Sequence, residues 1–311
     1  MHVMILGAAG MVGRKLVEKI AREPLAFGRP VTRLTLVDAF QPPVPEALRP
    51  VSTALTVDLA GAGAADRLIE GRPELIFHLA AIVSGEAEAD FDKGYAVNLD
   101  GTRALFDAIR QAGLTNPYVP RLVFASSIAV FGTPFPEVIP DEFFTTPLTS
   151  YGTQKAIAEL LLADYSRRGI FDGIGIRLPT ICVRPGTPNK AASGFFSNIL
   201  REPLVGKEAV LPVSDNVRHW FASPRAGRRL LRPCRDDRYG TDRGAAQPHH
   251  AGPFRAGLRR DRSAAPRGRR QGGRAHQTRA RSGDRTHRRR LADPVRRRES
   301  VFARLQGGDE L

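Results

Sequence analysis

The chain has few cysteines and no long apolar run, which argues against a disulfide-rich protein and against a membrane-spanning one. Its 311 residues include only two cysteines, Cys182 and Cys234. Two cysteines give no disulfide framework, so a reducing compartment is expected. No apolar stretch reaches the roughly 18 residues that a membrane-spanning helix needs, and the N-terminus has no leader-like pattern. We therefore expect a cytoplasmic protein with no membrane partner.

Lysine, isoleucine and methionine are absent after residue 225, where the charge balance also changes. Residues 1–225 hold 23 Lys plus Arg and 23 Asp plus Glu, so their net charge is zero. Residues 226–311 hold 24 Arg and 9 acidic residues, which accounts for the whole net charge of +15. Arg, Gly, Ala and Pro dominate this segment without helical or strand periodicity. The amino-acid composition and the net charge therefore both change near residue 225.

Two explanations fit this change. An Arg-rich arm could bind nucleic acid through its phosphates. A reading-frame slip in a GC-rich gene would also enrich Arg, Gly, Ala and Pro. With permitted codons of our choice, residues 227–241 can be read one base later as an apolar-rich helix. We favour the frame slip, so we do not expect a nucleic-acid partner. Residues 226–311 are then predicted to be poorly packed. We expect the product as written to be unstable or inactive, so the predicted function belongs to the protein with the intact reading frame.

A glycine-rich turn follows the first apolar run, residues 2–6. The glycines are Gly7, Gly10 and Gly13, and apolar residues then continue at helical spacing. Strand, tight turn and helix form a site for a dinucleotide, because the backbone can approach the pyrophosphate and the helix N-terminus attracts its charge. Asp38 ends the next apolar run, where a carboxylate would bind the ribose hydroxyls and repel a 2′-phosphate. The pattern favours NAD over NADP.

Further apolar runs end in polar or small residues at intervals suited to parallel strands with crossover helices. We therefore predict an α/β fold, a Rossmann-type doubly wound parallel sheet, with ligands at the carboxyl ends of its strands. Ala80 and Ala81 would leave room for the cofactor, Asp58 would lie near the adenine, and Asn98 could brace the sheet edge. His78 lies within an apolar strand and is interpreted as a core residue.

Tyr151 and Lys155 lie one helical turn apart and follow the Ser126–Ser127 pair. The unperturbed pKa of a tyrosine is about 10, but an ammonium on the same helical face can stabilise the phenolate. The pair would then act as a general base that removes a proton from an alcohol. Adjacent residues at a strand end point to opposite sides, so only one of the serines can face the substrate.

Taken together, these motifs resemble those of an extended short-chain dehydrogenase/reductase, over residues 1 to about 225. The resemblance implies that Lys155 lowers the pKa of Tyr151 and holds the nicotinamide ribose, while a serine orients the substrate oxygen. It also extends the cofactor-binding set beyond the residues above, to Met11, Val12, Leu59, Leu79 and Pro179. The family pattern implies an NAD-binding domain over residues 1–178, the start of a smaller substrate lobe over residues 179–225, and an Arg-rich tail over residues 226–311.

Within this superfamily, residues 177–186, 189–196 and 217–225 are similar to those of D-erythronate dehydrogenases. The resemblance implies NAD-dependent oxidation of a small sugar acid, with Thr180, Lys190 and Arg218 as substrate-binding candidates. The last two are cations that could offset the substrate's negative charge. A nucleoside-diphosphate-sugar 4-epimerase with the same Tyr and Lys is the alternative, and a non-enzymatic dinucleotide- or nucleic-acid-binding protein is third. No metal is implied, and the protein could form a homodimer.

Overall fold

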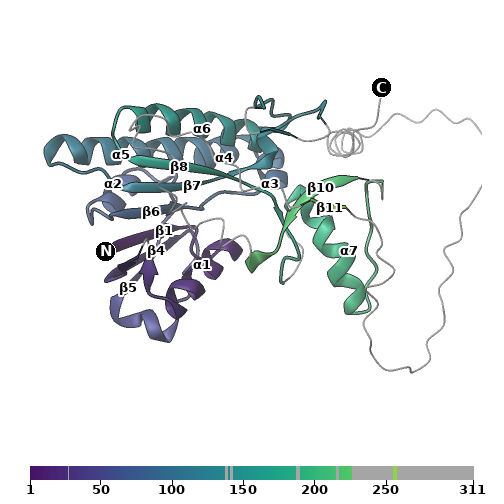
Figure 1. The fold of residues 1–311 in the computed structure, drawn as a ribbon, viewed down its shortest axis with the longest axis horizontal. Coiled ribbons are helices and arrows are strands. Elements are labelled where there is room, and N and C mark those ends of the chain that lie inside the picture. The colour runs from purple at the N-terminus through teal and green to yellow at the C-terminus, as the bar shows by residue number, and fades with distance from the viewer. Residues whose placement is uncertain are drawn as a thin grey trace, which may run out of the picture.

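The fold is a parallel sheet with helices on both faces, followed by a smaller unit beside the carboxyl ends of its strands (Figure 1). The computed structural model describes residues 1–26, 28–136, 139–140, 143–186, 190–214 and 217–225, and the backbone of residues 255–257. The poor packing predicted for residues 226–311 therefore concerns residues that lie outside this description, apart from the short strand at 255–257.

Six strands form the main sheet in the order β5-β4-β1-β6-β7-β8, and every neighbouring pair is parallel. The order reverses between β1 and β6, where a doubly wound sheet has its ligand-binding crevice. The predicted fold class is therefore confirmed. In chain order these strands are β1 (His2–Leu6), β4 (Arg33–Asp38), β5 (Ser52–Thr56), β6 (Leu75–His78), β7 (Arg121–Ser127) and β8 (Asp172–Leu178).

Helices cover both faces of this sheet and bury two apolar cores (Figure 1). On one face α1 (Met11–Arg22) packs through residues such as Leu16 and Ile20. On the other lie α2 (Ala64–Ile69), α5 (Gly101–Thr115) and α6 (Ser150–Arg167). The remaining helical elements are η1 (Glu46–Val51), α3 (Ser84–Ala89), α4 (Phe91–Tyr95), the π-helical η2 (Ala96–Asp100) and η3 (Ile128–Val130).

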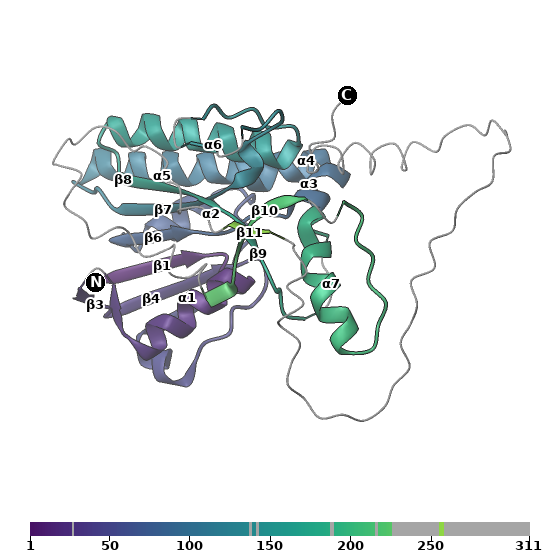
Figure 2. The same cartoon turned by 45° about the vertical axis from the view of Figure 1, so that its right-hand side comes forward.

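The chain leaves the main sheet after Leu178 and builds the smaller unit from short elements (Figure 2). β9 begins at Thr180 and pairs in parallel with β10, which in turn pairs antiparallel with β11. This pairing was not predicted from the sequence. The elements are β9 (Thr180–Ile181), η4 (Ala192–Gly194), α7 (Phe195–Leu204), β10 (Arg218–Ala222) and β11 (Arg255–Gly257), and a separate small hairpin joins β2 (Leu25–Ala26) to β3 (Arg29–Pro30).

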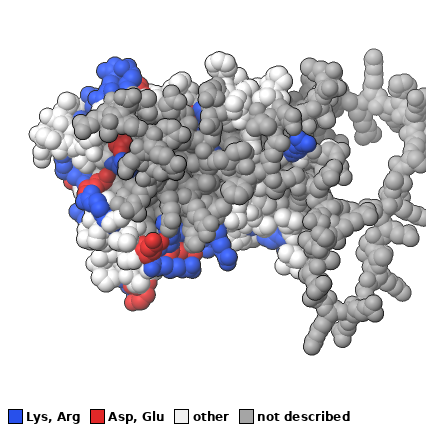
Figure 3. All heavy atoms as spheres, in the orientation of Figure 1, with Lys and Arg blue, Asp and Glu red and all other residues white. Residues whose placement is uncertain are grey.

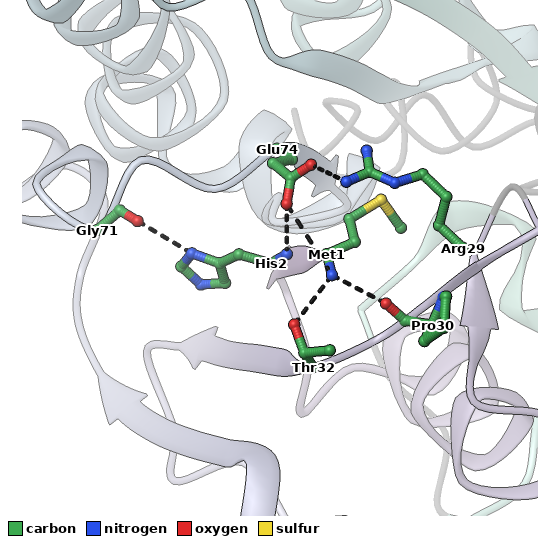
Figure 4. A network of polar contacts seen from close by, with 7 residues as sticks. All are labelled: Met1, His2, Arg29, Pro30, Thr32, Gly71 and Glu74. Carbon is green, nitrogen blue, oxygen red and sulfur yellow. Dashed lines mark hydrogen bonds and ion pairs between the residues drawn. The ribbon is translucent and has the colours of Figure 1, made fainter.

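Polar contacts at the amino end of β1 fix the edge of the sheet opposite the strand carboxyl ends (Figure 4). The amino group of Met1 donates to Thr32 Oγ1 and to the Pro30 carbonyl, both at 2.9 Å. The backbone N–H of His2 donates to Glu74, which also pairs with Arg29. On the surface, Lys and Arg side chains are interspersed with Asp and Glu over the sheet domain (Figure 3), as the zero net charge of residues 1–225 leads one to expect.

Candidate functional site

The glycine-rich turn contacts its neighbours too closely for side chains. Gly7 has a φ of +86°, and a Cβ atom there would lie 2.7 Å from the Ala80 nitrogen. A Cβ at Gly13 would lie 2.1 Å from the Gly7 carbonyl oxygen. The turn is held down by Val37, whose carbonyl accepts from the N–H groups of Gly7 and Ala8. No side chain fits at Gly7 or Gly13, as the tight turn of a phosphate-binding motif requires.

The N-terminus of α1 begins directly after the turn and has no side-chain cap. Gly10 is its N-cap residue and, because glycine has no side chain, the first turn receives no capping hydrogen bond from it. Met11 and Val12 are half-buried in that turn. The N–H groups at the start of a helix lack intrahelical partners and lie at the positive end of its dipole. This end of α1 therefore fits the pyrophosphate of a dinucleotide.

Asp38 lies at the carboxyl end of β4, beside the turn. Its Oδ2 accepts from the Ala9 N–H at 2.9 Å and its Oδ1 from the Phe40 N–H at 3.3 Å. Asp38 is half-buried. Asp58 is exposed and its Oδ1 accepts from the Ala60 N–H at 3.0 Å, whereas Leu59 is buried in the core. Of these residues, Asp38 is thus the carboxylate that contacts the glycine turn.

The loop after β6, the strand next to β1 in the sheet, is held by Asn98. The Oδ1 atom of Asn98 accepts from the Ile82 N–H at 2.9 Å, and its Nδ2 donates to the Ile82 carbonyl and, at 2.8 Å, to Gln154 on α6. The predicted brace therefore joins this loop to α6. Half-buried residues line the strand ends, namely Leu79, Ala80, Ala81 and Pro179. A helix N-terminus without a side-chain cap, a tight glycine turn and small residues at the ends of the strands together fit NAD.

His78 is buried in the sheet, as the sequence predicted. The Thr102 hydroxyl donates to the Asn98 carbonyl, so it accepts the hydrogen of His78 Nε2 across 2.8 Å. Nδ1 then keeps its lone pair, and it has no partner among the described residues. Burial, with the nearby Lys155 charge, lowers the pKa of His78 to about 3. The ring is neutral and belongs to the core.

Tyr151 stands in the first turn of α6, whose N-terminus is capped from two sides. Thr149 Oγ1 accepts from the Gly152 N–H, and Glu88 on α3 accepts from the Ser150 N–H at 2.7 Å. The Tyr151 ring is half-buried. Burial raises the pKa of Tyr151 to about 12, while a hydrogen bond with Ser127 and the charge of Arg184 act in the opposite direction.

Lys155 lies one turn further along α6 and is buried. Its Nζ donates to the Ala125 carbonyl at 2.9 Å and lies 4.6 Å from the Phe124 ring centroid and 5.8 Å from that of Tyr151. Burial lowers the pKa of Lys155 to about 8, against the effect of Glu159. The expected lowering of the Tyr151 pKa by Lys155 is not seen in this arrangement, because burial dominates and the ammonium is directed at β7.

The two serines at the end of β7 point to different sides. The hydroxyl of Ser126 is buried and donates to Glu159 at 2.5 Å. The hydroxyl of Ser127 accepts from the Ala129 N–H at 3.1 Å, and it faces Tyr151, whose pKa it lowers. The sequence left open which serine faces the tyrosine, and in the structure it is Ser127.

The substrate-binding candidates of the second unit fall into two groups. Thr180 is buried, and its Oγ1 lies 2.7 Å from Nε2 of His219, a residue that sequence reasoning missed. His219 stacks on Phe196, and burial lowers its pKa to about 4, so the ring is neutral. Lys190 and Arg218 are exposed. Their side chains therefore lie on the surface of this unit.

Arg184 is a further cation that sequence reasoning missed. It is half-buried, its Nε donates to the Ile181 carbonyl at 3.1 Å and its Nη2 to Ser193 Oγ at 3.0 Å. It lies within residues 177–186, which the family resemblance had already marked, but no spacing rule distinguishes it from other arginines. Its proximity to Tyr151 depends on how the second unit folds against the first.

Two kinds of feature are absent from the part of the chain that the structure describes. No group of three or more His, Cys, Asp or Glu side chains gathers there to hold a metal ion. None of the helices in the same residues is long and apolar enough to cross a membrane.

A doubly wound sheet with this turn at its switch point, and with Tyr151 facing Ser127 at the end of β7, is typical of a dinucleotide-dependent class of enzyme. Comparison with known proteins gives the family. Residues 3–223 match the NAD dependent epimerase/dehydratase family, and the chain belongs to it. NAD as the cofactor is thereby confirmed, as is the expected class, an NAD-dependent dehydrogenase of the extended short-chain dehydrogenase/reductase type.

Two curated relatives are D-erythronate dehydrogenases. That of Cupriavidus necator is 46% identical over 230 residues, which cover 73% of this chain and 69% of the relative. That of Haemophilus influenzae is 45% identical over 224 residues, 72% of this chain and 69% of the relative. Among solved structures, a nucleoside-diphosphate-sugar epimerase from Agrobacterium tumefaciens shares 60% identity at a TM-score of 0.77, covering 83% of this chain and 75% of that one.

Proposed function

We propose that this protein oxidises a small sugar acid, D-erythronate, at C2 to the 2-oxo acid. The observation that carries the proposal is the pairing of Tyr151 with Ser127 at the end of β7, in a chain 46% and 45% identical to two D-erythronate dehydrogenases. An NAD-dependent dehydrogenase needs a proton acceptor beside its alcohol. The tyrosine supplies the acceptor, and the relatives supply the substrate class.

The proposed reaction assigns one task to each side chain. Ser127 holds the substrate hydroxyl oxygen beside Tyr151, and Tyr151 in its phenolate form accepts the hydroxyl proton and becomes the neutral phenol as the carbinol C–O bond becomes a carbonyl. Bound NAD supplies the acceptor for the hydride that leaves the same carbon. Arg184 and Ser127 favour the phenolate and oppose the effect of burial. Lys155 keeps a positive charge beneath the site and is proposed to contact the nicotinamide ribose.

We propose the glycine turn, the first turn of α1 and Asp38 as the cofactor-binding residues. Backbone N–H groups after Gly10 would bind the pyrophosphate, and Asp38, already fixed by the Ala9 N–H, would bind the ribose hydroxyls. Residues 1–178 then form the NAD-binding domain, and residues 179–225 begin the substrate lobe. That division agrees with the departure of the chain from the main sheet after Leu178.

A spectrophotometric assay tests the proposed reaction. Protein expressed from a gene with the intact reading frame is mixed with NAD and D-erythronate, and NADH absorbance is followed while the 2-oxo acid is trapped as a hydrazone. We expect equal amounts of NADH and 2-oxo acid, and no NADH with erythritol, which lacks the carboxylate. Erythritol oxidation at a rate similar to that of D-erythronate would contradict the sugar-acid assignment.

A second candidate is a nucleotide-sugar epimerase, favoured by the description of the Agrobacterium tumefaciens structure. Such an enzyme would use the same tyrosine and would return the hydride to its substrate. UDP-glucose conversion to a C4 epimer, without accumulation of NADH, would support this candidate over the dehydrogenase.

A further inference from the structure

We propose that Arg184 binds the anionic group of the substrate, a carboxylate, beside Tyr151. This inference rests on the proposed function, because it assigns the charge-recognising residue of the same site. Neither the glycine turn nor the Tyr–Lys pair is assigned to the substrate's negative charge, and the sequence indicated Lys190 and Arg218 for that role.

The position of Arg184 is fixed by contacts of both its backbone and its side chain. The backbone N–H donates to the buried Ser197 hydroxyl at 3.0 Å, and the carbonyl accepts from Arg201 at 2.8 Å. The guanidinium donates to the Ile181 carbonyl and to the Ser193 hydroxyl. A guanidinium held in this way loses little side-chain entropy when it binds an anion, so its planar donors are preorganised.

The guanidinium is also linked to the start of α6, and so to Tyr151, through the contacts of α3. Its charge acts on the Tyr151 phenol, and an ionised Tyr151 in turn acts on Arg184. The segment from Ala192 to Ser193, whose hydroxyl holds Arg184, is tied to the start of α3 by a hydrogen bond from the Ala192 N–H to Ser84. Because α3 also caps α6 beside Tyr151 through Glu88, one set of contacts positions both groups.

The connectivity of a 2-hydroxy acid explains why these two groups should be neighbours. Its carboxylate is bonded directly to the carbon that bears the reacting hydroxyl. A cation that binds the carboxylate must therefore lie next to the base that accepts the hydroxyl proton. The diphosphate of a nucleotide sugar is attached at C1, across the ring from a reacting C4, so its cation would lie further from the tyrosine.

Arg184 also fits this role better than the two cations that the sequence indicated. Lys190 and Arg218 are exposed, where water competes for the substrate's charge and weakens each ion pair. Arg184 is half-buried, and a bidentate pair with a carboxylate is stronger where water is partly excluded.

Substitutions of Arg184 test the proposal through binding and turnover. Arg184→Gln and Arg184→Lys are prepared in the full chain, with the surface variant Arg167→Gln as a control. The dissociation constants of D-erythronate and erythritol are measured by calorimetry in the presence of NADH, and KM and kcat in the presence of NAD. We expect Arg184→Gln to weaken D-erythronate binding about 100-fold and leave erythritol binding unchanged. Arg184→Lys should recover part of the loss, since it keeps the charge but not the planar fork.

Three results would overturn the proposal. The first is that Arg184→Gln leaves D-erythronate binding unchanged, or weakens it only as much as it weakens erythritol binding. The second is that Arg218→Gln or Lys190→Gln weakens D-erythronate binding more than Arg184→Gln does. The third is that Arg184→Gln abolishes UDP-glucose binding and keeps D-erythronate binding, which would assign Arg184 to a phosphate. NADH affinity and thermal unfolding report whether each variant is folded, and Arg184→Lys replaces Arg184→Gln where the latter fails.

The same data separate this inference from the proposed function. Wild-type protein that binds D-erythronate through Arg184 but produces no NADH would contradict the proposed reaction alone. Wild-type protein that oxidises D-erythronate, with KM and kcat unaffected by Arg184→Gln, would contradict the role of Arg184 alone. Wild-type protein that binds neither D-erythronate nor the shorter acid D-glycerate would overturn both.

Discussion

Ser126 donates a hydrogen bond of 2.5 Å to Glu159 beneath the candidate site. Glu159 also accepts from Nε and Nη2 of Arg177, and all three side chains are buried. A buried carboxylate needs such partners, because an unsatisfied charge would cost several kcal/mol. The Ser126 hydroxyl is therefore committed to the protein interior, and Ser127 is the serine that meets Tyr151.

This difference predicts opposite consequences for the two serines. Ser127→Ala should lower kcat about 10- to 100-fold and change the free energy of unfolding by less than about 0.5 kcal/mol. Ser126→Ala should lower the free energy of unfolding by about 1 to 3 kcal/mol, because it removes a hydrogen bond to a buried charge. Urea titration and steady-state kinetics on both variants make the comparison. The reverse pattern would mean that Ser126 faces the substrate.

Tyr151→Phe removes the proposed proton acceptor and nothing else. We expect a fall in kcat of at least about 100-fold, with NAD affinity unchanged within about threefold. Tyr165→Phe, on the same helix, is the matched control, since its hydroxyl donates to Asp107 away from the site. Fluorescence titration with NADH measures cofactor binding. Turnover above about a tenth of the wild-type value in Tyr151→Phe would exclude the tyrosine as the general base.

Asp38 is predicted to determine the choice between NAD and NADP. Asp38→Ala removes both the ribose contacts and the repulsion of a 2′-phosphate, so the preference for NAD should relax. Asp38→Asn keeps an acceptor for the Ala9 N–H and removes only the charge, which separates the two effects. The measurement is the ratio of the dissociation constants of NADH and NADPH. A ratio that neither substitution changes would place Asp38 away from the ribose.

Burial of His78 predicts a loss of stability in acid. Its pKa is lowered to about 3 in the folded protein, against about 6.5 for an exposed histidine. Between these values the unfolded state binds a proton that the folded state does not, so the free energy of unfolding falls as pH falls. By about pH 4 this contribution reaches about 3 kcal/mol. His78→Gln keeps a donor for Thr102 and should flatten this dependence, which urea titrations at several pH values would detect. An equal dependence in both proteins would mean that His78 is accessible to protons.

The parallel sheet and the residues at the carboxyl ends of its strands could be predicted, because both follow from short local patterns in the sequence. Short apolar runs gave the six strands, and Gly7, Gly13 and Asp38 lie where a strand, turn and helix must place them. Tyr151 and the serines follow from the same order of elements, since parallel strands all end at one edge.

The rest depends on contacts between distant residues, which spacing does not record. Ser126 and Ser127 could be told apart only once Glu159 and Arg177 were placed beneath β7. Arg184 became a candidate because the segment after β9 is hydrogen-bonded to α3, which also caps α6 beside Tyr151. The pKa of Tyr151 could not be predicted either, because the effect of burial exceeds that of any neighbouring charge.

The reading-frame slip that we favour after residue 225 leads to the last prediction, which concerns the gene. The family match ends at residue 223, close to where lysine and isoleucine disappear and the whole net charge of +15 begins. The two D-erythronate dehydrogenases match over only 69% of their own length. We expect the nucleotide sequence to contain, one base over, an open frame with apolar residues at helical spacing. A gene restored to that frame should give a product with a higher free energy of unfolding and a lower KM for D-erythronate. Sequencing that finds no such frame, together with salt-dependent binding of DNA by the chain as written, would instead establish residues 226–311 as a basic arm.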